Sequence, residues 1–593
     1  MTRIRTNRPL LRLPGSSVGT AGPLAGVRLV AAGAGVATEL AARHLWALGC
    51  QLGPRGELRA GEAGRLELGR LSCSIDWAGP VALPLRHETE VQAACGIAQL
   101  HGRRYGGPRP LGIDYASAVA AVLAVQGLLA ARYALLRGSA VREVRTSVAE
   151  AALLTVSHYL SAATVSTAED RAGDRAVVAA PAGGGAPPFT SRDGVRFEIE
   201  ALGPGQWLAF WSRLGVADPV IGRGWPPFQL RFATARCRLP IELSLAAAEL
   251  PYQQLAAVAA GAGLSIVPVR AGGPCGYPAP PWRIARAAEP WPQTVPSPRT
   301  GPVRPTGPAL STGLALSTDP ALPTSPALPA DPPGAPAPTR PLEGVVVVEL
   351  TRRLSGPLSG RLLALLGAEV VRIEPPGGEP PRPLRSAAGE LPARCHPLDH
   401  GKRVVQADPR SAEGRRTIRE LVGGADVFLH NLAPREDTAL GLDAERLLTE
   451  QPGLVHARVS AWGELFGDHP PFGSDYLVQA HSGLAALVTP PGHPVTPSLM
   501  TITEIFSGLI SAEGVLAGLL ARAATGFGQR IESSLWSAAV TLLDTATPTA
   551  TATGTAGRGL RCATVEEVAS DPRFAAALGR DGCPLPRSPW EFR

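Results

Sequence analysis

The sequence is nearly devoid of lysine, since Lys402 is the single one and every other basic residue is an arginine. Methionine (2 residues) and aromatic residues (5%) are also scarce, whereas glycine (67) and proline (60) are abundant. We interpret this skew as a bias toward GC-rich codons. The net charge of +7 is spread along the chain without basic blocks, which argues against a protein dedicated to nucleic acids. With 45% hydrophobic and 18% charged residues, a mostly disordered chain is excluded as well.

Metal-binding motifs and targeting signals are missing too. The eight cysteines are scattered and show no CxxC or Cys/His ligand spacing, so no metal site is predicted. Residues 1–15 include arginines but no continuous apolar segment, so a secretory signal is not expected. The longest apolar stretch, Ala116 to Leu136, contains Gln126 and Arg132, which favours a buried helix over a membrane span. We therefore expect a cytoplasmic protein with no membrane or nucleic-acid partner.

The chain contains two related halves on either side of a linker. Residues 294–340 are dominated by Pro, Ala, Thr and Ser, a composition that cannot bury enough apolar surface to fold. Residues 23–30 (PLAGVRLV) match 341–348 (PLEGVVVV), and 91–96 (VQAACG) match 478–483 (VQAHSG). A repeat this long indicates a duplicated domain.

The two copies are unequal, and we predict four segments. The interval Gly49–Gln92 is much shorter than its counterpart Gly367–Gln479, so the first copy is the reduced one. The predicted segments are a first, shortened domain (1–178), a small α+β domain (188–293), the linker (294–340) and a second, fuller domain (341–593).

An α/β fold is predicted for both copies. The valine-rich run Val345–Leu350, a helical stretch Gly356–Leu366 and a second apolar run Ala368–Ile373 form a β-α-β pattern. Further apolar runs, each typical of a strand, occupy 426–430 and 454–459. Strands alternating with helices predict a Rossmann-like, doubly wound parallel sheet, which binds ligands at the carboxyl ends of its strands.

Three positions could carry chemistry, each with a structural alternative. Lys402 and Arg403 stand together before a short strand and could hold a phosphate, or form a solvated turn. Asn431 follows a strand end, where its amide could bind a ligand or shape a turn. Glu504 introduces a long apolar helix, where it could complement the helix dipole or act as a nucleophilic carboxylate toward an activated acyl group.

An ordered series of motifs resembles the class III CoA-transferases, the CaiB–BaiF family. The resemblance spans most of 341–540 and is weaker over 22–165. Residues 188–292 are similar to the small domain of the family, and 568–590 to its closing segment. The motifs that carry it are Pro341-Leu-Glu-Gly-Val, Glu349-Leu-Thr351, Ser355-Gly-Pro357, Leu366-Gly-Ala-Glu369, Gly401-Lys-Arg403, Ala425-Asp-Val with Asn431, Leu440-Gly-Leu442 and Gly526-Phe-Gly-Gln-Arg530.

The resemblance implies an activity, a substrate and roles for residues. Family members move coenzyme A between carboxylic acids and form two interlocked chains, so this chain would be a pseudo-dimer within one polypeptide, with or without further dimerisation. Coenzyme A would be a substrate and no cofactor would be tightly bound. Lys402, Arg403, Asn431 and Arg372 would lie along the CoA nucleotide. Glu504 stands at the position of the aspartate that attacks the acyl-CoA thioester and forms a mixed anhydride.

Departures from the family pattern leave alternatives open. A glutamate replaces the aspartate at Glu504, and Ser117 stands at the equivalent position of the first copy, which we therefore expect to be inactive. Ala439 replaces an arginine that contacts CoA in the family, and Ser474 stands where the racemase branch has a histidine. One alternative is a pseudoenzyme that binds CoA esters or serves as a scaffold. Another is a racemase of 2-methylacyl-CoA, against which Ser474 counts.

Overall fold

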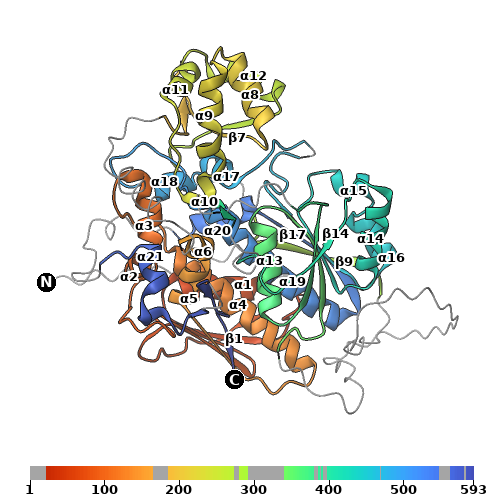
Figure 1. The fold of residues 1–593 in the computed structure, drawn as a ribbon. Coiled ribbons are helices and arrows are strands. Elements are labelled where there is room, and N and C mark those ends of the chain that lie inside the picture. The colour runs from red at the N-terminus through yellow and green to blue at the C-terminus, as the bar shows by residue number, and fades with distance from the viewer. Residues whose placement is uncertain are drawn as a thin grey trace.

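The computed structural model describes ten stretches of the chain. They comprise residues 22–163, 185–272, 279–290, 340–378, 385–386, 389–390, 397–467, 469–545, 561–579 and 583–593. The linker predicted at 294–340 lies outside them except for Arg340. The described part is an α/β protein with two large sheets and a small third domain (Figure 1).

The second copy forms the sheet that its strand pattern predicts. Six of its seven strands are parallel, in the order β14-β11-β10-β15-β16-β17, and β9 is antiparallel at the edge next to β17. This is the order of a doubly wound sheet, with its topological switch between β10 and β15. The strands are β10 (Val346–Leu350), β11 (Glu369–Glu374), β14 (Arg403–Gln406), β15 (Val427–His430), β16 (Val455–Ser460), β17 (Phe527–Ser534) and β9 (Trp282–Pro290).

The first copy builds a mixed sheet, so the expectation of a parallel sheet there is wrong. Its order is β2-β1-β3-β4-β5-β20, in which β3 is antiparallel to both β1 and β4. A hairpin with a two-residue turn at Gly69 and Arg70 replaces helical crossovers, which explains the shortened interval; Gly69 takes a φ of +60° that glycine adopts without strain. The strands are β1 (Arg28–Ala32), β2 (Gln51–Leu52), β3 (Glu62–Leu68), β4 (Leu71–Asp76), β5 (Glu143–Ser147) and β20 (Glu591–Phe592).

Two long helices form the centre of the molecule. Helix α4 (Tyr115–Leu136) covers β4 and β5, helix α19 (Ile502–Thr525) covers β16 and β17, and the two pack against each other. Both are long and apolar enough to cross a membrane, yet 83% and 100% of their most apolar windows are buried. Their lack of a polar face follows from this position, because each helix is enclosed by a sheet on one side and by helices on the others. The stretch Ala116 to Leu136 thus lies in a core helix.

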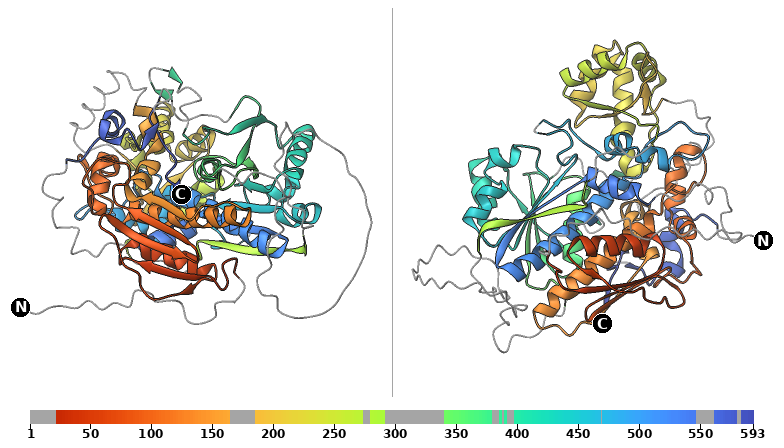
Figure 2. Two further views of the ribbon diagram at one scale, coloured as in Figure 1. Left: turned by 90° about the horizontal axis from the view of Figure 1, so that it is seen from below. Right: turned by 180° about the vertical axis from the view of Figure 1, so that it is seen from behind.

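The small domain projects from the two sheets (Figure 2). Its antiparallel sheet has the order β6-β7-β8, and aromatic rings fill its core: Trp207 stacks on Phe228 at 4.3 Å and meets Trp211 edge-on at 5.4 Å. Its elements are β6 (Phe189–Thr190), β7 (Arg196–Glu200), α8 (Pro204–Arg213), α9 (Asp218–Gln229), α10 (Arg231–Thr234), α11 (Ile241–Ala248), α12 (Tyr252–Gly261) and β8 (Ser265–Pro268). Strand β9, which lies within the segment predicted as the small domain, joins the second sheet.

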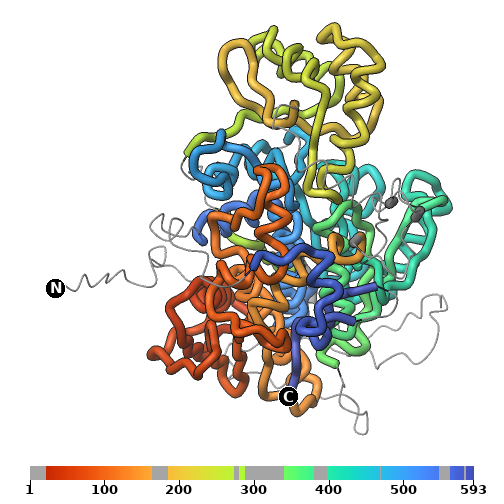
Figure 3. Tube along the Cα trace, turned by 60° about the vertical axis from the view of Figure 1, so that its left-hand side comes forward, coloured from red at the N-terminus to blue at the C-terminus, as the bar shows by residue number. Residues whose placement is uncertain are grey.

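The two halves exchange edge strands. Strand β9 follows the first copy in sequence but pairs with β17 of the second, whereas β20 follows the second copy but pairs with β5 of the first. Figure 3 shows this C-terminal segment, in dark blue, beside the N-terminal part of the chain. The exchange is matched in detail: Trp282 packs over Gly514 of α19, and Trp590 packs over Gly127 of α4. Each half is therefore completed by a segment that follows the other.

Candidate active site

A cavity of about 1530 Å³ lies where the second sheet faces the small domain. Its walls come from the segments that follow β10, β15, β16 and β17, together with the loop after β7 and helices α9 and α10 of the small domain. This is the carboxyl edge of a doubly wound sheet, where such folds bind ligands. Of the residues singled out from the sequence, Glu504, Asn431 and Arg372 line the cavity, whereas Lys402 and Arg403 do not.

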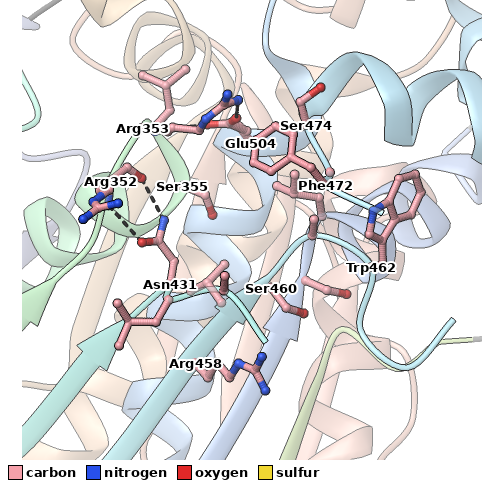
Figure 4. A pocket seen from close by; sticks show the side chains of 18 of the residues that line it. Arg352, Arg353, Ser355, Asn431, Arg458, Ser460, Trp462, Phe472, Ser474 and Glu504 are labelled. Carbon is pink, nitrogen blue, oxygen red and sulfur yellow. Dashed lines mark hydrogen bonds and ion pairs between the residues drawn. The ribbon is translucent and has the colours of Figure 1, made fainter. Parts of the chain in front are cut away.

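Glu504 lies in the first turn of α19 and is 5% exposed. Its Oε2 accepts a hydrogen bond from the Leu354 N–H at 3.0 Å, and its Oε1 lies 3.7 Å from the Arg353 guanidinium (Figure 4). Burial raises the pKa of Glu504, while Arg353 and the N–H groups of Leu354 and Ser355 act in the opposite direction. The arrangement places a desolvated carboxyl group, with a backbone donor and a nearby guanidinium, at a cavity wall, where a nucleophilic carboxylate could act.

Asp475, which the sequence analysis missed, supports Glu504 from behind. It begins α17 (Asp475–Ser482), and its Oδ2 accepts hydrogen bonds from the Thr503 hydroxyl at 2.6 Å and the Glu504 N–H at 2.7 Å. Burial raises the pKa of Asp475 to about 7. A signal was present in the sequence, because a carboxylate stands four residues before the glutamine in both copies: Asp475 before Gln479, and Glu88 before Gln92.

In the first copy, the residues equivalent to Asp475 and Glu504, which are Glu88 and Ser117, are hydrogen-bonded to each other. The Glu88 carboxylate accepts hydrogen bonds from the Ser117 N–H at 2.8 Å, from the Ser117 hydroxyl at 2.6 Å and from the Gln92 amide at 2.8 Å. Ser117 is 4% exposed, and its hydroxyl is directed at Glu88. A hydroxyl in this position cannot form an anhydride, so the structure adds a packing reason to the expectation that the first copy is inactive.

Lys402 has a partner other than a phosphate. Its ammonium lies 2.7 Å from Glu349 Oε2 and donates to the Pro357 carbonyl at 2.7 Å, and its side chain is fully buried. Burial lowers the pKa of Lys402 and Glu349 opposes that change. The neighbouring helix allows this approach because Gly360 carries no side chain; a Cβ there would lie 1.9 Å from Glu349 Oε2. The single lysine is therefore part of a buried ion pair beneath α13 (Ser355–Leu365).

The other predicted CoA contacts are also engaged within the protein. Arg372 is 4% exposed along its side chain and lies beside Glu349 (3.2 Å), Glu374 (3.1 Å) and Asp399 (3.0 Å). Arg403 is half-exposed on the edge strand β14, 3.5 Å from Glu369. A role for Lys402, Arg403 and Arg372 along the CoA nucleotide stays a prediction, and any phosphate would have to compete with carboxylates for them.

Asn431 holds the loop that carries the site. Its Oδ1 accepts from the Arg352 N–H at 2.9 Å, and its Nδ2 donates to the Arg352 carbonyl at 2.8 Å (Figure 4). This bidentate contact fixes the segment between β10 and α13, and with it Arg353 and Leu354 beside Glu504. Asn431 therefore positions, from a neighbouring strand end, the residues that contact Glu504, while its predicted contact with CoA stays a prediction.

Two separate segments of the chain match the model of one protein family. The model of CoA-transferase family III matches residues 77–275 and 342–571. The chain is 35% identical over 205 residues to a succinate–glutarate CoA-transferase of Agrobacterium fabrum, covering 33% of this chain and 51% of that protein. It is 34% identical over 212 residues to a probable fatty acyl-CoA transferase of Mycobacterium tuberculosis, covering 35% of this chain and 53% of that protein.

A solved structure is similar over the same share of the chain. A CaiB/BaiF family protein from Brucella suis is 34% identical, and the match covers 34% of this chain and 55% of that chain with a TM-score of 0.31. The chain spans about half the length of the curated relatives it matches.

Proposed function

Because the chain belongs to CoA-transferase family III, we propose that it moves coenzyme A between two carboxylic acids at one site built around Glu504. The observation that carries the proposal is the buried Glu504 carboxylate, held by the Leu354 N–H and the Arg353 guanidinium at the wall of a large cavity. The relatives include transferases named for dicarboxylates and for fatty acyl groups, so their names leave the acyl group open.

The chemistry would proceed by covalent catalysis at one carboxylate. A Glu504 oxygen attacks the thioester carbonyl of the donor, the C–S bond breaks, and CoA leaves as the thiolate while an acyl-glutamyl anhydride forms. The thiolate then attacks the glutamyl carbonyl and releases the donor acid as a carboxylate. The acceptor carboxylate repeats both steps in reverse: it displaces CoA from Glu504 to form a new anhydride, and the thiolate takes the acceptor acyl group and restores the free carboxylate.

Trapping the covalent intermediate tests this function. The full chain is incubated with an acyl-CoA and a free acid, treated with hydroxylamine or borohydride, and digested for mass spectrometry. We expect the modification on the peptide that contains Glu504, together with exchange of CoA between the two acids. Absence of both with several acyl-CoA donors would contradict the proposal.

A non-catalytic CoA-ester-binding protein is the second candidate. The observation that favours it is that neither copy has the family's aspartate, since Glu504 stands at that position in the second copy and Ser117 in the first. Tight binding of an acyl-CoA without exchange, unchanged in a Glu504→Gln variant, would support this second function over the first.

The pH dependence of transfer follows from the two buried carboxyl groups. The pKa of Glu504 is raised above its ordinary value of 4.5, so the inactive protonated form accumulates at higher pH than for an exposed glutamate. Asp475, with a pKa of about 7, takes up a proton in the same direction and loses strength as an acceptor for the Glu504 N–H. We therefore expect kcat to fall as pH is lowered through the neutral range, measured against a surface control such as Arg416→Gln. A rate that stays constant down to an acidity at which exposed glutamates protonate would contradict this expectation.

A further inference from the structure

The residue beside the nucleophile, Arg353, has an unusual backbone conformation. Its φ is +66°, in the left-handed region that is strained for a residue other than glycine. The preceding residue, Arg352, is held on both its N–H and its carbonyl by Asn431, so the surrounding structure maintains this conformation. Backbone strain is often retained at binding sites, so the conformation at the cavity rim indicates that the Arg353 side chain has a role there.

The Arg353 side chain is placed to receive an anion. Its guanidinium lies 5.0 Å from the Phe472 ring centroid and 3.7 Å from Glu504 Oε1, and 40% of the side chain is exposed. The distance to Glu504 allows Coulomb attraction but exceeds that of a hydrogen bond. Within the described parts of the chain, no hydrogen bond from this guanidinium is formed, so its fork of donors faces the cavity.

Three buried hydroxyl groups lie on the same walls. Ser355, Ser474 and Thr501 line the cavity at 5%, 1% and 2% exposure, and none of their hydroxyl oxygens has a hydrogen-bond partner among the described residues. Each hydroxyl is next in sequence to an element that contacts Glu504. Ser355 follows Leu354, Ser474 precedes Asp475, and Thr501 stands at the start of α19 (Figure 4 shows the first two). A buried hydroxyl without a hydrogen-bond partner is destabilising; a hydrocarbon chain in the cavity would leave it unpaired, whereas a substrate oxygen could pair with it.

The charge on Glu504 changes during the proposed reaction, and this change removes the counter-ion of Arg353. As the free carboxylate, Glu504 balances the Arg353 charge; as an anhydride or thioester it is neutral. Arg353 then lacks its counter-ion in a half-buried position, unless the bound acid supplies one. A monocarboxylic acid consumes its only carboxylate in the reaction and cannot do so.

We propose that the acids exchanged at this site are short dicarboxylates, with the far carboxylate paired to Arg353 and the reacting carboxyl group hydrogen-bonded by Ser355, Ser474 and Thr501. The inference rests on the proposed function, because it is the acylated state of Glu504 that leaves Arg353 unpaired. Arg353 is on this view the residue that selects the substrate.

Binding of free acids to a neutral form of the site tests the inference without turnover. In a Glu504→Gln protein, whose amide stands for the acylated carboxyl group, calorimetry compares succinate with butyrate, which has the same number of carbons. We expect succinate to bind at least about tenfold more tightly, as a charge-assisted bidentate pair provides. Adding Arg353→Gln should remove the difference, Arg353→Lys should retain part of it, and Arg416→Gln on the exposed face of α14 (Ala412–Gly423) should leave it unchanged. Equal binding of the two acids, or a preference that survives Arg353→Gln, would overturn the inference.

Transfer assays separate this inference from the function on which it rests. With otherwise wild-type protein, the ratio of kcat/KM for glutarate over valerate should fall by roughly tenfold or more in Arg353→Gln. Exchange that is equally fast with both acids overturns the dicarboxylate preference and leaves the transferase intact. Absence of exchange with every acid sinks the transferase, and the binding comparison then still decides whether Arg353 selects a dicarboxylate.

Discussion

Replacement of Glu504 by glutamine is expected to lower the rate of CoA transfer by roughly 10⁴-fold or more, the scale on which loss of a covalent nucleophile is felt. The amide keeps the size of the side chain and can still accept from the Leu354 N–H, so the packing of α19 should be preserved. What is lost is the anionic oxygen that attacks the thioester. Steady-state transfer from an acyl-CoA to a free acid measures the effect.

Glu504→Asp is the informative control for that loss. It restores the residue that the family pattern has at this position, but withdraws the carboxylate by one methylene in a site shaped around glutamate. A displacement of about 1 Å can cost ~100-fold in rate, so the aspartate variant should fall between wild type and Glu504→Gln. A glutamine variant within tenfold of wild type would show that Glu504 is not the nucleophile, provided that its thermal unfolding is unchanged.

Replacement of Glu513 by alanine is expected to lower the free energy of unfolding by about 2 kcal/mol or more, because it leaves two buried hydrogen-bonding groups, on His44 and Trp282, without their partner. The Glu513 side chain is fully buried in α19, and its two oxygens lie 3.0 Å from Nδ1 of His44 on α1 (Val36–Ala47). Its Oε1 also accepts from the Trp282 indole N–H at 3.1 Å on β9. One carboxylate thus joins the first copy, the second copy and the exchanged strand.

Two variants make the Glu513 experiment decisive. Glu513→Gln keeps an oxygen for both donors and should lose much less stability than Glu513→Ala. Glu450→Ala removes a half-exposed pair with Arg446 on α16 (Ala444–Glu450) and should change stability by less than about 1 kcal/mol. Urea denaturation, with hydrogen exchange of β9 to localise the change, measures all three. A Glu513→Ala loss no larger than that of Glu450→Ala would contradict the view that this contact joins the halves.

The second sheet was predictable and the first was not, for a physical reason. Runs such as Val346–Leu350 are largely apolar, with Glu349 as the exception, because strands buried on both faces need no alternation, and that pattern indicates a parallel sheet. In the first copy, the direction of β3 depends on a two-residue turn at Gly69 and on pairing with β1, which no local pattern near β1 contains. A resemblance to the second copy therefore misled the prediction where the chain had been shortened.

Of the predicted site residues, Glu504, Asn431 and Arg372 line the cavity. Glu504 is recognisable in the sequence because a carboxylate introduces a long, largely apolar helix. Arg353 and Asp475 acquire their roles from neighbours far along the chain, namely Phe472 and the backbone of Glu504. Lys402 is the opposite case. Its local sequence allows a phosphate contact, but its ammonium lies against Glu349, a residue of a different strand far away in the sequence.

The amino-acid sequence by itself determined the family resemblance and the second doubly wound sheet, because these depend on local patterns and on the spacing of motifs; the two unequal copies and a nucleophile at Glu504 are predictions from the same patterns. Only the tertiary structure decided which halves complete each other, that the single lysine is buried in an ion pair, and which side chains surround Glu504. Those properties depend on long-range contacts between β9 and β17, between β20 and β5, and across the cavity. The packing and electrostatic energies of such contacts arise between distant segments, so no single stretch of residues encodes them.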